Sequence, residues 1–259
     1  MCMITSTANR RVKWVRALQT KRHARQEEGV FVIEGVRLAR EAVASQSPVK
    51  LVLHTDNLGA RERGLVNNLA RLGAEIEVVS ESVMVACSST ESPPGLLVVL
   101  PTPTIPSPEP LSFALVVDRL ADPGNLGTIL RTALAAGVEV LFLTKGTVDP
   151  FNPKVVRSAT GAHFRLPIEI LEPRALAQRL DGMQIWIAEA GHGVLYHEVN
   201  WRQSIALIIG CEAHGPQPAI RSLAKGQVQI PMRVSSDSLN AAIAAAVILF
   251  EIARQRGEP

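Results

Sequence analysis

The chain has 259 residues, of which 47% are hydrophobic and 20% charged, and its formal net charge at pH 7 is +3. This composition excludes a mainly disordered chain, and the longest apolar stretch, residues 239–250, is shorter than the roughly 20 residues that span a bilayer. Three widely spaced cysteines without a C-x-x-C pair predict neither a disulfide framework nor a thiolate zinc site, and they favour a reducing cytoplasm.

The first 26 residues form a basic segment that contains no acid. Its charged side chains cluster near Trp14 and are Arg10, Arg11, Lys13, Arg16, Lys21, Arg22 and Arg25. Such a cluster fits a solvated surface and an arm that contacts nucleic-acid phosphates equally well. It also resembles an organelle transit peptide, but the segment runs directly into the patterned stretch 30–43 without a cleavage-like break, so we expect it to belong to the first domain.

Short apolar runs and helical patterns alternate over residues 1–100. We expect strands at residues 31–34, 49–54, 75–79 and 96–100, and helices at residues 36–44 and 61–73. Residues 101–112 contain five prolines, which favour an extended, semi-rigid linker. The sequence therefore predicts a small α/β domain at 1–100, a linker at 101–112 and a second domain at 113–259.

In the second domain, apolar β-rich runs again alternate with helical segments. The expected strands are residues 114–118, 138–144, 164–170, 184–190, 205–210 and 227–232, and helices are expected to begin near Asn125, Lys154, Pro173, Pro216 and Leu239. This alternation predicts a parallel sheet covered by helices on both faces. Ligands bind such sheets outside the carboxyl ends of the strands. Functional residues are therefore expected in the loops after Val117, Leu143, Ile209 and Ile230.

The first of these loops opens the stretch DRLADPGNLGTILRTALAAG, residues 118–137. Asn125 follows a Pro-Gly turn and is a fair helix cap, and Arg131 lies six residues later. A capped amphipathic helix with one solvated arginine is the simplest interpretation. However, Arg131 has few polar neighbours on its own helix, so an anion from elsewhere is a plausible partner.

The second loop is IIGCEAHGPQP, residues 208–218, and the third is IPMRVSSDSLNAAIAAA, residues 230–246. Gly210 ends a strand and allows close approach of the backbone to a ligand, although a tight strand-to-helix turn alone would explain it. One of the oxygens between Ser235 and Ser238 is expected to cap the terminal helix. Asn240 is left unexplained, as an amide that we expect to be buried among Ala and Ile.

Taken together, DPGNLGTILRTA, IIGCEAHG and IPMRVSSDSLNAA resemble the SpoU (TrmH-type) family of RNA ribose 2′-O-methyltransferases, members of the SPOUT superfamily. The stretch 147–167 resembles the segment after the family's second strand. Residues 9–43 resemble the small RNA-binding domain of the rRNA-modifying members, with Lys21, Arg22, Arg25 and Glu34 at recognisable positions.

The resemblance implies a parallel-sheet SPOUT domain with a deep trefoil knot, S-adenosylmethionine as cofactor, RNA as partner and a homodimer formed through the C-terminal domain. It implies a catalytic set of Asn125, Arg131, Glu212, Ser238 and Asn240. The implied cofactor-binding residues are Leu143, Thr144, Gly146, Gly210, Ile230, Met232, Ser238 and Leu239. The implied RNA-binding residues are Arg10, Arg11, Lys13, Lys21, Arg22 and Arg25.

Methyl transfer from a sulfonium requires alignment of the ribose hydroxyl and stabilisation of its developing charge, and no metal. A guanidinium has no acceptor, so we expect Arg131 to bind a phosphate and stabilise the alkoxide rather than to act as a base. Ribosomal RNA is the expected substrate because of the upstream domain. Transfer RNA, a catalytically silent RNA-binding homologue and a generic nucleotide-binding α/β protein are the alternatives.

Overall fold

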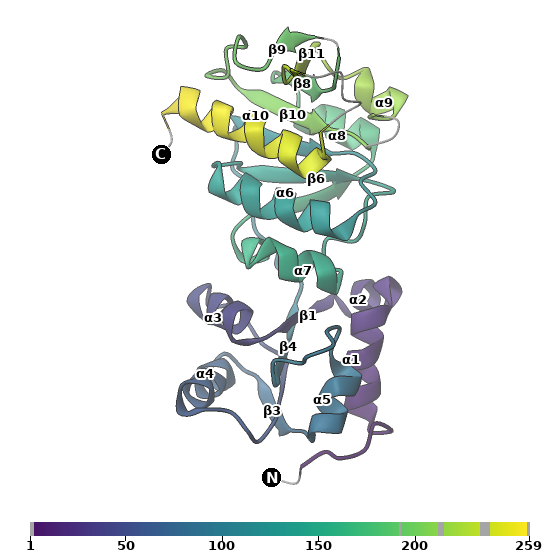
Figure 1. Cartoon of the computed structure of the whole chain (residues 1–259), viewed down its shortest axis with the longest axis vertical. Coiled ribbons are helices and arrows are strands. Elements are labelled where there is room, and N and C mark those ends of the chain that lie inside the picture. Colours follow the sequence, from purple (N-terminus) through teal and green to yellow (C-terminus); the bar gives the residue numbers. More distant parts are fainter. Residues whose placement is uncertain (1–2, 192, 212–214, 234–238, 258–259) are drawn as a thin grey trace. The chain divides into compact units, whose positions relative to one another are not determined.

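The computed structural model describes residues 3–191, 193–211, 215–233 and 239–257. By their contacts, these residues form two compact units (Figure 1). The first unit comprises Met1–Thr104 and Asp149–Phe164, and the second comprises Ile105–Val148 and Arg165–Pro259. Residues 149–164, expected in the second domain, belong by their contacts to the first unit.

The first unit is built on a four-stranded sheet with the order β1-β4-β2-β3. Strand β4 pairs antiparallel with both β1 and β2, and β2 pairs parallel with β3. The strands are β1 (Val30–Glu34), β2 (Leu51–His54), β3 (Glu75–Val78) and β4 (Leu96–Pro101). The helices are α1 (Arg10–Thr20), α2 (Arg22–Glu28), α3 (Val36–Ala44), α4 (Ala60–Arg71), α5 (Glu81–Cys87), α7 (Pro153–Ala159) and a 3-10 turn at Ala162–Phe164.

Helices cover both faces of this sheet, which explains why β1 is buried throughout. Successive side chains of a strand point to opposite faces. Phe31 and Ile33 therefore join the core formed with α3, α4 and α7, and Val30 and Val32 join the core formed with α1 and α5. The small α/β domain expected from the sequence is confirmed, and helices α1, α2 and α5 are additions that its patterns did not predict.

Aromatic packing and a buried ion pair hold the segment 149–164 in the first unit. Phe151 packs against Phe31 with ring centroids 5.2 Å apart. The Arg25 guanidinium donates to the Asp149 carboxylate from Nε, at 2.8 Å, and both side chains are less than one-tenth exposed. These contacts explain the assignment of the segment to the first unit. The assignment was not predicted, because local sequence patterns do not show which core a connecting segment enters.

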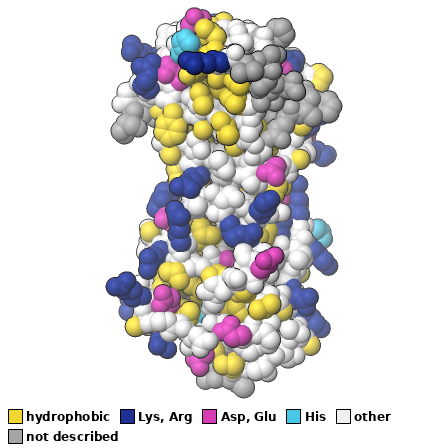
Figure 2. Space-filling model, in the orientation of Figure 1, with side chains coloured by type: hydrophobic (Ala, Val, Ile, Leu, Met, Phe, Trp, Pro, Cys, Tyr) yellow, Lys and Arg dark blue, Asp and Glu magenta, His cyan; other side chains and the backbone are white. Residues whose placement is uncertain are grey.

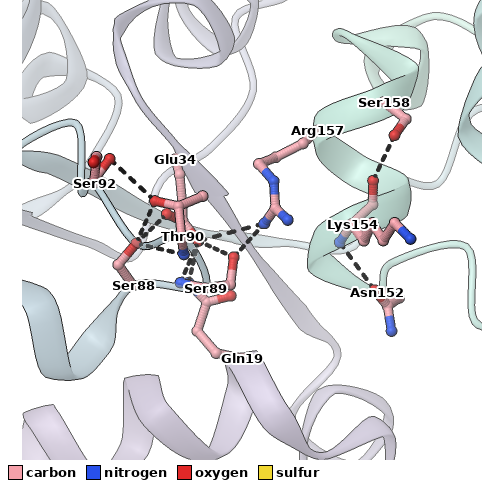
Figure 3. Close-up of polar contacts among 10 residues, drawn as sticks. All are labelled: Gln19, Glu34, Ser88, Ser89, Thr90, Ser92, Asn152, Lys154, Arg157 and Ser158. Atoms are coloured by element: carbon pink, nitrogen blue, oxygen red, sulfur yellow. Dashed lines mark hydrogen bonds and ion pairs between the residues drawn. The ribbon is translucent and has the colours of Figure 1, made fainter. Parts of the chain in front are cut away.

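Glu34, the last residue of β1, organises a second set of contacts within the first unit (Figure 3). Its carboxylate accepts hydrogen bonds from Gln19 Nε2 at 2.8 Å, from Ser88 Oγ at 2.7 Å and from Ser89 N at 2.9 Å. The Arg157 guanidinium, on α7, donates to Ser89 Oγ and lies 3.9 Å from Glu34. One carboxylate thus connects α1, the loop after α5 and α7.

The second unit has a seven-stranded sheet with the order β7-β6-β5-β10-β8-β11-β9, and every strand pair in it is parallel. The strands are β5 (Phe113–Val117), β6 (Val140–Thr144), β7 (Ile168–Leu171), β8 (Gln184–Ala188), β9 (Val194–Leu195), β10 (Ile205–Ile209) and β11 (Gly226–Gln229). The helices are α6 (Pro123–Ala135), α8 (Pro173–Arg179), α9 (Pro218–Arg221) and α10 (Ala241–Arg256).

The central strands β5, β6 and β10 are buried along their whole length, as expected for a parallel sheet with helices on both faces. Helices α6 and α10 pack against each other beside the sheet (Figure 1). The prediction of a parallel-sheet α/β domain is confirmed. No described helix is long and apolar enough to cross a membrane.

Candidate active site

The carboxyl ends of the central strands form a continuous edge in the second unit. Val117 pairs with Leu143 on one side and with Ile209 on the other, and Ile209 pairs with Ala188. The loops that the sequence analysis singled out after β5, β6 and β10 therefore begin next to one another. Their adjacency follows from parallel pairing, which places all carboxyl ends at one edge of the sheet.

Asp118 holds these loops together through hydrogen bonds. It was not among the site residues predicted from the sequence. Its side chain is fully buried directly after β5. It accepts hydrogen bonds from Thr144 Oγ1 at 2.5 Å, Gln217 N at 2.7 Å and Gln217 Nε2 at 2.8 Å. One carboxylate therefore holds the loop after β6 and the loop that leads into α9. An acid immediately after an apolar strand was the available sequence signal.

The predicted cofactor residues at the ends of β6 and β10 occupy this edge. Leu143 and Thr144 end β6 and are buried, and Gly146 follows with a φ of +96°, which favours glycine. A Cβ at Gly210 would lie 2.6 Å from the carbonyl carbon of Gly215, so only glycine fits at this position beside the Gly215 backbone. The edge therefore presents backbone groups at places where side chains cannot fit.

The third loop contributes Ile230, Met232 and Leu239 to the described residues. Ile230 follows β11 and is half-buried, Met232 is 43% exposed, and Leu239 is half-buried before α10. Glu212 and Ser238, both predicted site residues, lie outside the described residues. The described members of the predicted cofactor set therefore lie in two kinds of place. Most lie at or shortly after the end of a strand, and Leu239 lies just before α10.

Asn125 and Asn240 come together across α6 and α10. The Asn240 side-chain amide donates to Asn125 Oδ1 at 3.0 Å, although the two residues lie 115 positions apart in sequence. Asn240 Oδ1 also accepts from the backbone of Ala242 at 2.9 Å and of Ile243 at 3.3 Å, so Asn240 is the N-cap of α10. One amide therefore both caps a helix and orients a second predicted site residue.

These contacts correct three expectations from the sequence. Asn240, and not an oxygen between Ser235 and Ser238, caps α10. Asp122, and not Asn125, caps α6, because its carboxylate accepts from Asn125 N at 2.7 Å. Asn125 lies in the first turn, where its side chain is available to Asn240. Asn240 is exposed rather than buried, so its polarity needs no special explanation beyond capping and this contact.

Arg131 lies on α6, six residues after Asn125 and therefore about 9 Å further along the helix axis. Its side chain is exposed and makes no hydrogen bond or ion pair with any described residue. The structure therefore does not bring Arg131 into contact with the Asn125–Asn240 pair. The exposed Arg131 guanidinium is accessible to an anion from solvent.

The basic residues predicted to bind RNA divide into three groups in the first unit. Arg10, Lys13, Lys21 and Arg22 are exposed on or beside α1 and α2. Arg11 is half-exposed and pairs with Glu75 and Glu77. Arg25 is only 4% exposed in its ion pair with Asp149, so it differs from the exposed members of the set, and its assignment to RNA binding stays a prediction.

Among the described residues, no group of three or more His, Cys, Asp or Glu side chains could hold a metal ion. The described edge of the sheet is instead rich in glycine, amides and one buried carboxylate. This donor set suits an organic ligand held by backbone groups and side-chain amides. It also suits a reaction that depends on alignment and hydrogen bonding.

The chain matches two families. Residues 112–250 match the SpoU rRNA Methylase family, and residues 9–98 match the MRM3-like substrate binding domain. A relative from Bacillus subtilis, the "23S rRNA (guanosine(2553)-2'-O)-methyltransferase RlmP", is 34% identical over 97% of this chain and 99% of its own length. A relative from Streptomyces viridochromogenes, the "23S rRNA (uridine(2479)-2'-O)-methyltransferase", is also 34% identical, over 98% of this chain and 92% of its own length.

A solved structure agrees with these sequence matches. The AdoMet-bound rRNA methyltransferase from Sinorhizobium meliloti superposes with a TM-score of 0.87 at 27% identity. The match covers 98% of this chain and 97% of that one, so it includes both units. The resemblance that the sequence motifs indicated is thereby confirmed over nearly the whole chain.

Proposed function

The chain belongs to the SpoU rRNA Methylase family, and on that premise we propose that it transfers a methyl group from S-adenosylmethionine to a ribose 2′-hydroxyl of 23S-type ribosomal RNA. The observation that carries the proposal is the Asn125–Asn240 hydrogen bond. It joins the first and third sequence motifs beside the edge at which the strand ends meet. The tRNA alternative is not favoured, because both relatives described above are named for 23S rRNA and align with nearly the full chain.

The residues at the edge fit the cofactor. Backbone groups after β6, β10 and β11 are available near Gly146, Gly210 and Ile230, and Asp118 fixes the loops that carry the first two. When bound, S-adenosylmethionine supplies an activated methyl group. The protein must hold the ribose hydroxyl in line with that methyl group and stabilise the charge that develops on the hydroxyl oxygen.

Arg131 binds the phosphate next to the target ribose and stabilises the nascent alkoxide, because a guanidinium can donate several hydrogen bonds but cannot accept a proton. Asn125 and Asn240 orient the ribose, with Asn240 held in place by its capping bonds to α10. Glu212 and Ser238 complete the proposed set, as the family resemblance implied.

We also propose a homodimer formed through α10, a knotted SPOUT domain and a cytoplasmic location. Ile243 and Phe250 support the dimer: they are 54% and 49% exposed and lie seven residues apart, on one face of α10. Light scattering should give twice the chain mass for the wild type. It should give a smaller mass for the double variant Ile243→Glu/Phe250→Glu, whereas a wild-type monomer at micromolar concentration would contradict the dimer.

The test of the activity is methyl transfer from labelled S-adenosylmethionine to 23S rRNA and to tRNA transcripts, followed by mapping of ribose-methylated positions. We expect label on one or a few 23S rRNA riboses. Arg131→Lys and Arg131→Gln should both slow turnover, by about 100-fold for the glutamine variant if Arg131 meets the developing charge. Near-full turnover by Arg131→Lys would exclude a bidentate role, and label only on tRNA would exclude rRNA as substrate.

A further inference from the structure

A basic cleft in the first unit lies between α3 and α4, which pack side by side. Its volume is about 620 Å³. Its polar lining consists of Arg40, Arg61, Arg71, Asn67 and Asn68. None of these residues belongs to a motif that the sequence reveals, because the α4 segment shows only a helical pattern.

The cleft concentrates positive charge without a matching acid. Among the residues that the structure describes, no Asp or Glu lines it. Arg40 and Arg61 are exposed and make no hydrogen bond or ion pair with any described residue, and Arg71 makes one long contact to Asn68 Oδ1, at 3.4 Å. Arg11, on the other face of the same sheet, shows the usual arrangement, since it is paired with two glutamates.

Three guanidiniums around one cavity, none of them in an ion pair with a described residue, repel one another unless an anion lies between them. The space-filling view shows Lys and Arg side chains along the lower left of the molecule, where α3 and α4 are labelled in the cartoon (Figures 1 and 2). A guanidinium presents several donors in a plane and forms bidentate hydrogen bonds with phosphate. The charge of the cleft therefore fits a phosphate-bearing ligand.

The rest of the lining favours RNA over a small anion. Val43 and Leu65 provide an apolar floor, and the Asn67 and Asn68 amides lie beside it. Unpaired bases of RNA rest on apolar or guanidinium surfaces and bond through their edges to side-chain amides, while their phosphates contact arginine. A cavity of this size also exceeds the need of a single phosphate, and its arginines come from two helices, which suits successive phosphates of one strand.

We propose that the α3–α4 cleft binds single-stranded RNA through its phosphodiester backbone, at a site separate from the basic residues of α1 and α2. The inference rests on the proposed RNA-methylating function and adds the place where the first unit grips the substrate. The two basic regions lie on opposite faces of the sheet, because α3 and α4 pack on the Phe31 side of β1 and α1 on the Val30 side.

The experiment uses the full chain and a 23S rRNA transcript, with binding measured by filter retention at several salt concentrations. The cleft variant is Arg40→Gln/Arg61→Gln, and the matched control Arg174→Gln/Lys225→Gln removes the same charge from exposed positions of the second unit. Each lost phosphate contact should reduce the slope of log Kd against log salt by about 0.7 for single-stranded RNA. We therefore expect a reduction of about 1.4 and at least tenfold weaker binding for the cleft variant, with the control like the wild type.

Two further variants make the outcome decisive. Arg40→Lys/Arg61→Lys keeps the charge and should recover most of the slope, which a merely misfolded variant would not explain. Arg10→Gln/Lys13→Gln tests α1 as the competing site. The proposal is overturned if the cleft variant binds like the control, or if only the α1 variant weakens binding. Failure of the proposed function is distinguishable, because the wild type would then bind RNA without methylating it.

Discussion

Two buried carboxylates, Asp118 and Glu34, perform a similar task in the two units with different consequences. Each stands at the end of a buried strand, Asp118 just after β5 and Glu34 as the last residue of β1. Each accepts several hydrogen bonds from segments distant in sequence. Asp118, however, holds two loops of the candidate active site, whereas Glu34 holds a helix, a loop and α7.

The difference lies in what surrounds the partners. Thr144 ends β6 and Gln217 precedes α9, so both of these Asp118 partners lie at the sheet edge, and the carboxylate shapes the candidate ligand site. Among the Glu34 partners, Ser89 is exposed and Arg157 is one-third exposed. Water can therefore replace some of the hydrogen bonds that the Glu34 carboxylate accepts. A buried carboxylate, Asp118, thus holds the candidate ligand site in the second unit. A second buried carboxylate, Glu34, helps to attach a chain segment in the first unit.

The largest expected effect comes from Asp118→Ala. Removal of the carboxylate leaves the Gln217 backbone N–H, its amide and the Thr144 hydroxyl without their acceptor, so we expect the free energy of unfolding of the second unit to fall by about 4 kcal/mol. The affinity for S-adenosylmethionine, measured by calorimetry, should fall at least tenfold. The exposed Asp181→Ala serves as control, and equal affinity in both variants would remove Asp118 from the site.

Glu34→Ala should have a smaller effect on stability, about 2 kcal/mol, because water can reach the partly exposed Ser88 and Ser89. Urea denaturation of the first unit would measure it, with the exposed Glu91→Ala on the same loop as reference. The affinity for S-adenosylmethionine should stay unchanged. A loss of affinity equal to that of Asp118→Ala would erase the distinction between the two carboxylates.

His163 adds a pH dependence to the attachment of the segment 149–164. Burial lowers the pKa of His163 to about 4, from an ordinary value of 6.5. Neutral Nε2–H donates to the Pro150 carbonyl at 2.7 Å, and Nδ1 has no partner among the described residues. Because the unfolded chain binds the proton more tightly, stability is full above pH 6.5 and is lost as the pH falls toward 4.

The wild type should therefore lose about 2 kcal/mol of unfolding free energy between pH 7.5 and pH 5 relative to His163→Gln. Denaturation midpoints of both proteins at the two pH values give this difference, and the shared titration of other groups cancels. Parallel pH profiles would show that the ring is not held neutral in the folded state.

The smallest expected effect is that of Arg157→Ala, about 1 kcal/mol, since its guanidinium is partly exposed and lies 3.9 Å from Glu34. Limited proteolysis near α7 would test whether it fastens the segment. The exposed Lys154→Ala, on the same helix, is the reference. Identical cleavage rates for both variants would assign the attachment to Arg25 and the aromatic core alone.

Much of the second unit could be predicted from the sequence because the signals are local. Apolar runs marked the central strands, and their alternation with helical segments predicted the parallel sheet. Helix starts were predicted within a few residues, as at α8 and α10. The caps of α6 and α10 were not, because several neighbouring oxygens could serve and only the folded backbone selects Asp122 and Asn240.

The sequence by itself determined which motifs carry the family resemblance and that their loops follow strand ends, since both depend on residue order. Only the tertiary structure decided that Asn240 touches Asn125, that Asp118 binds Gln217 and that Arg25 is buried against Asp149. It also decided that residues 149–164 join the first unit. These contacts join residues about 100 positions apart, and strand register and core packing, rather than any local pattern, set the distances between them.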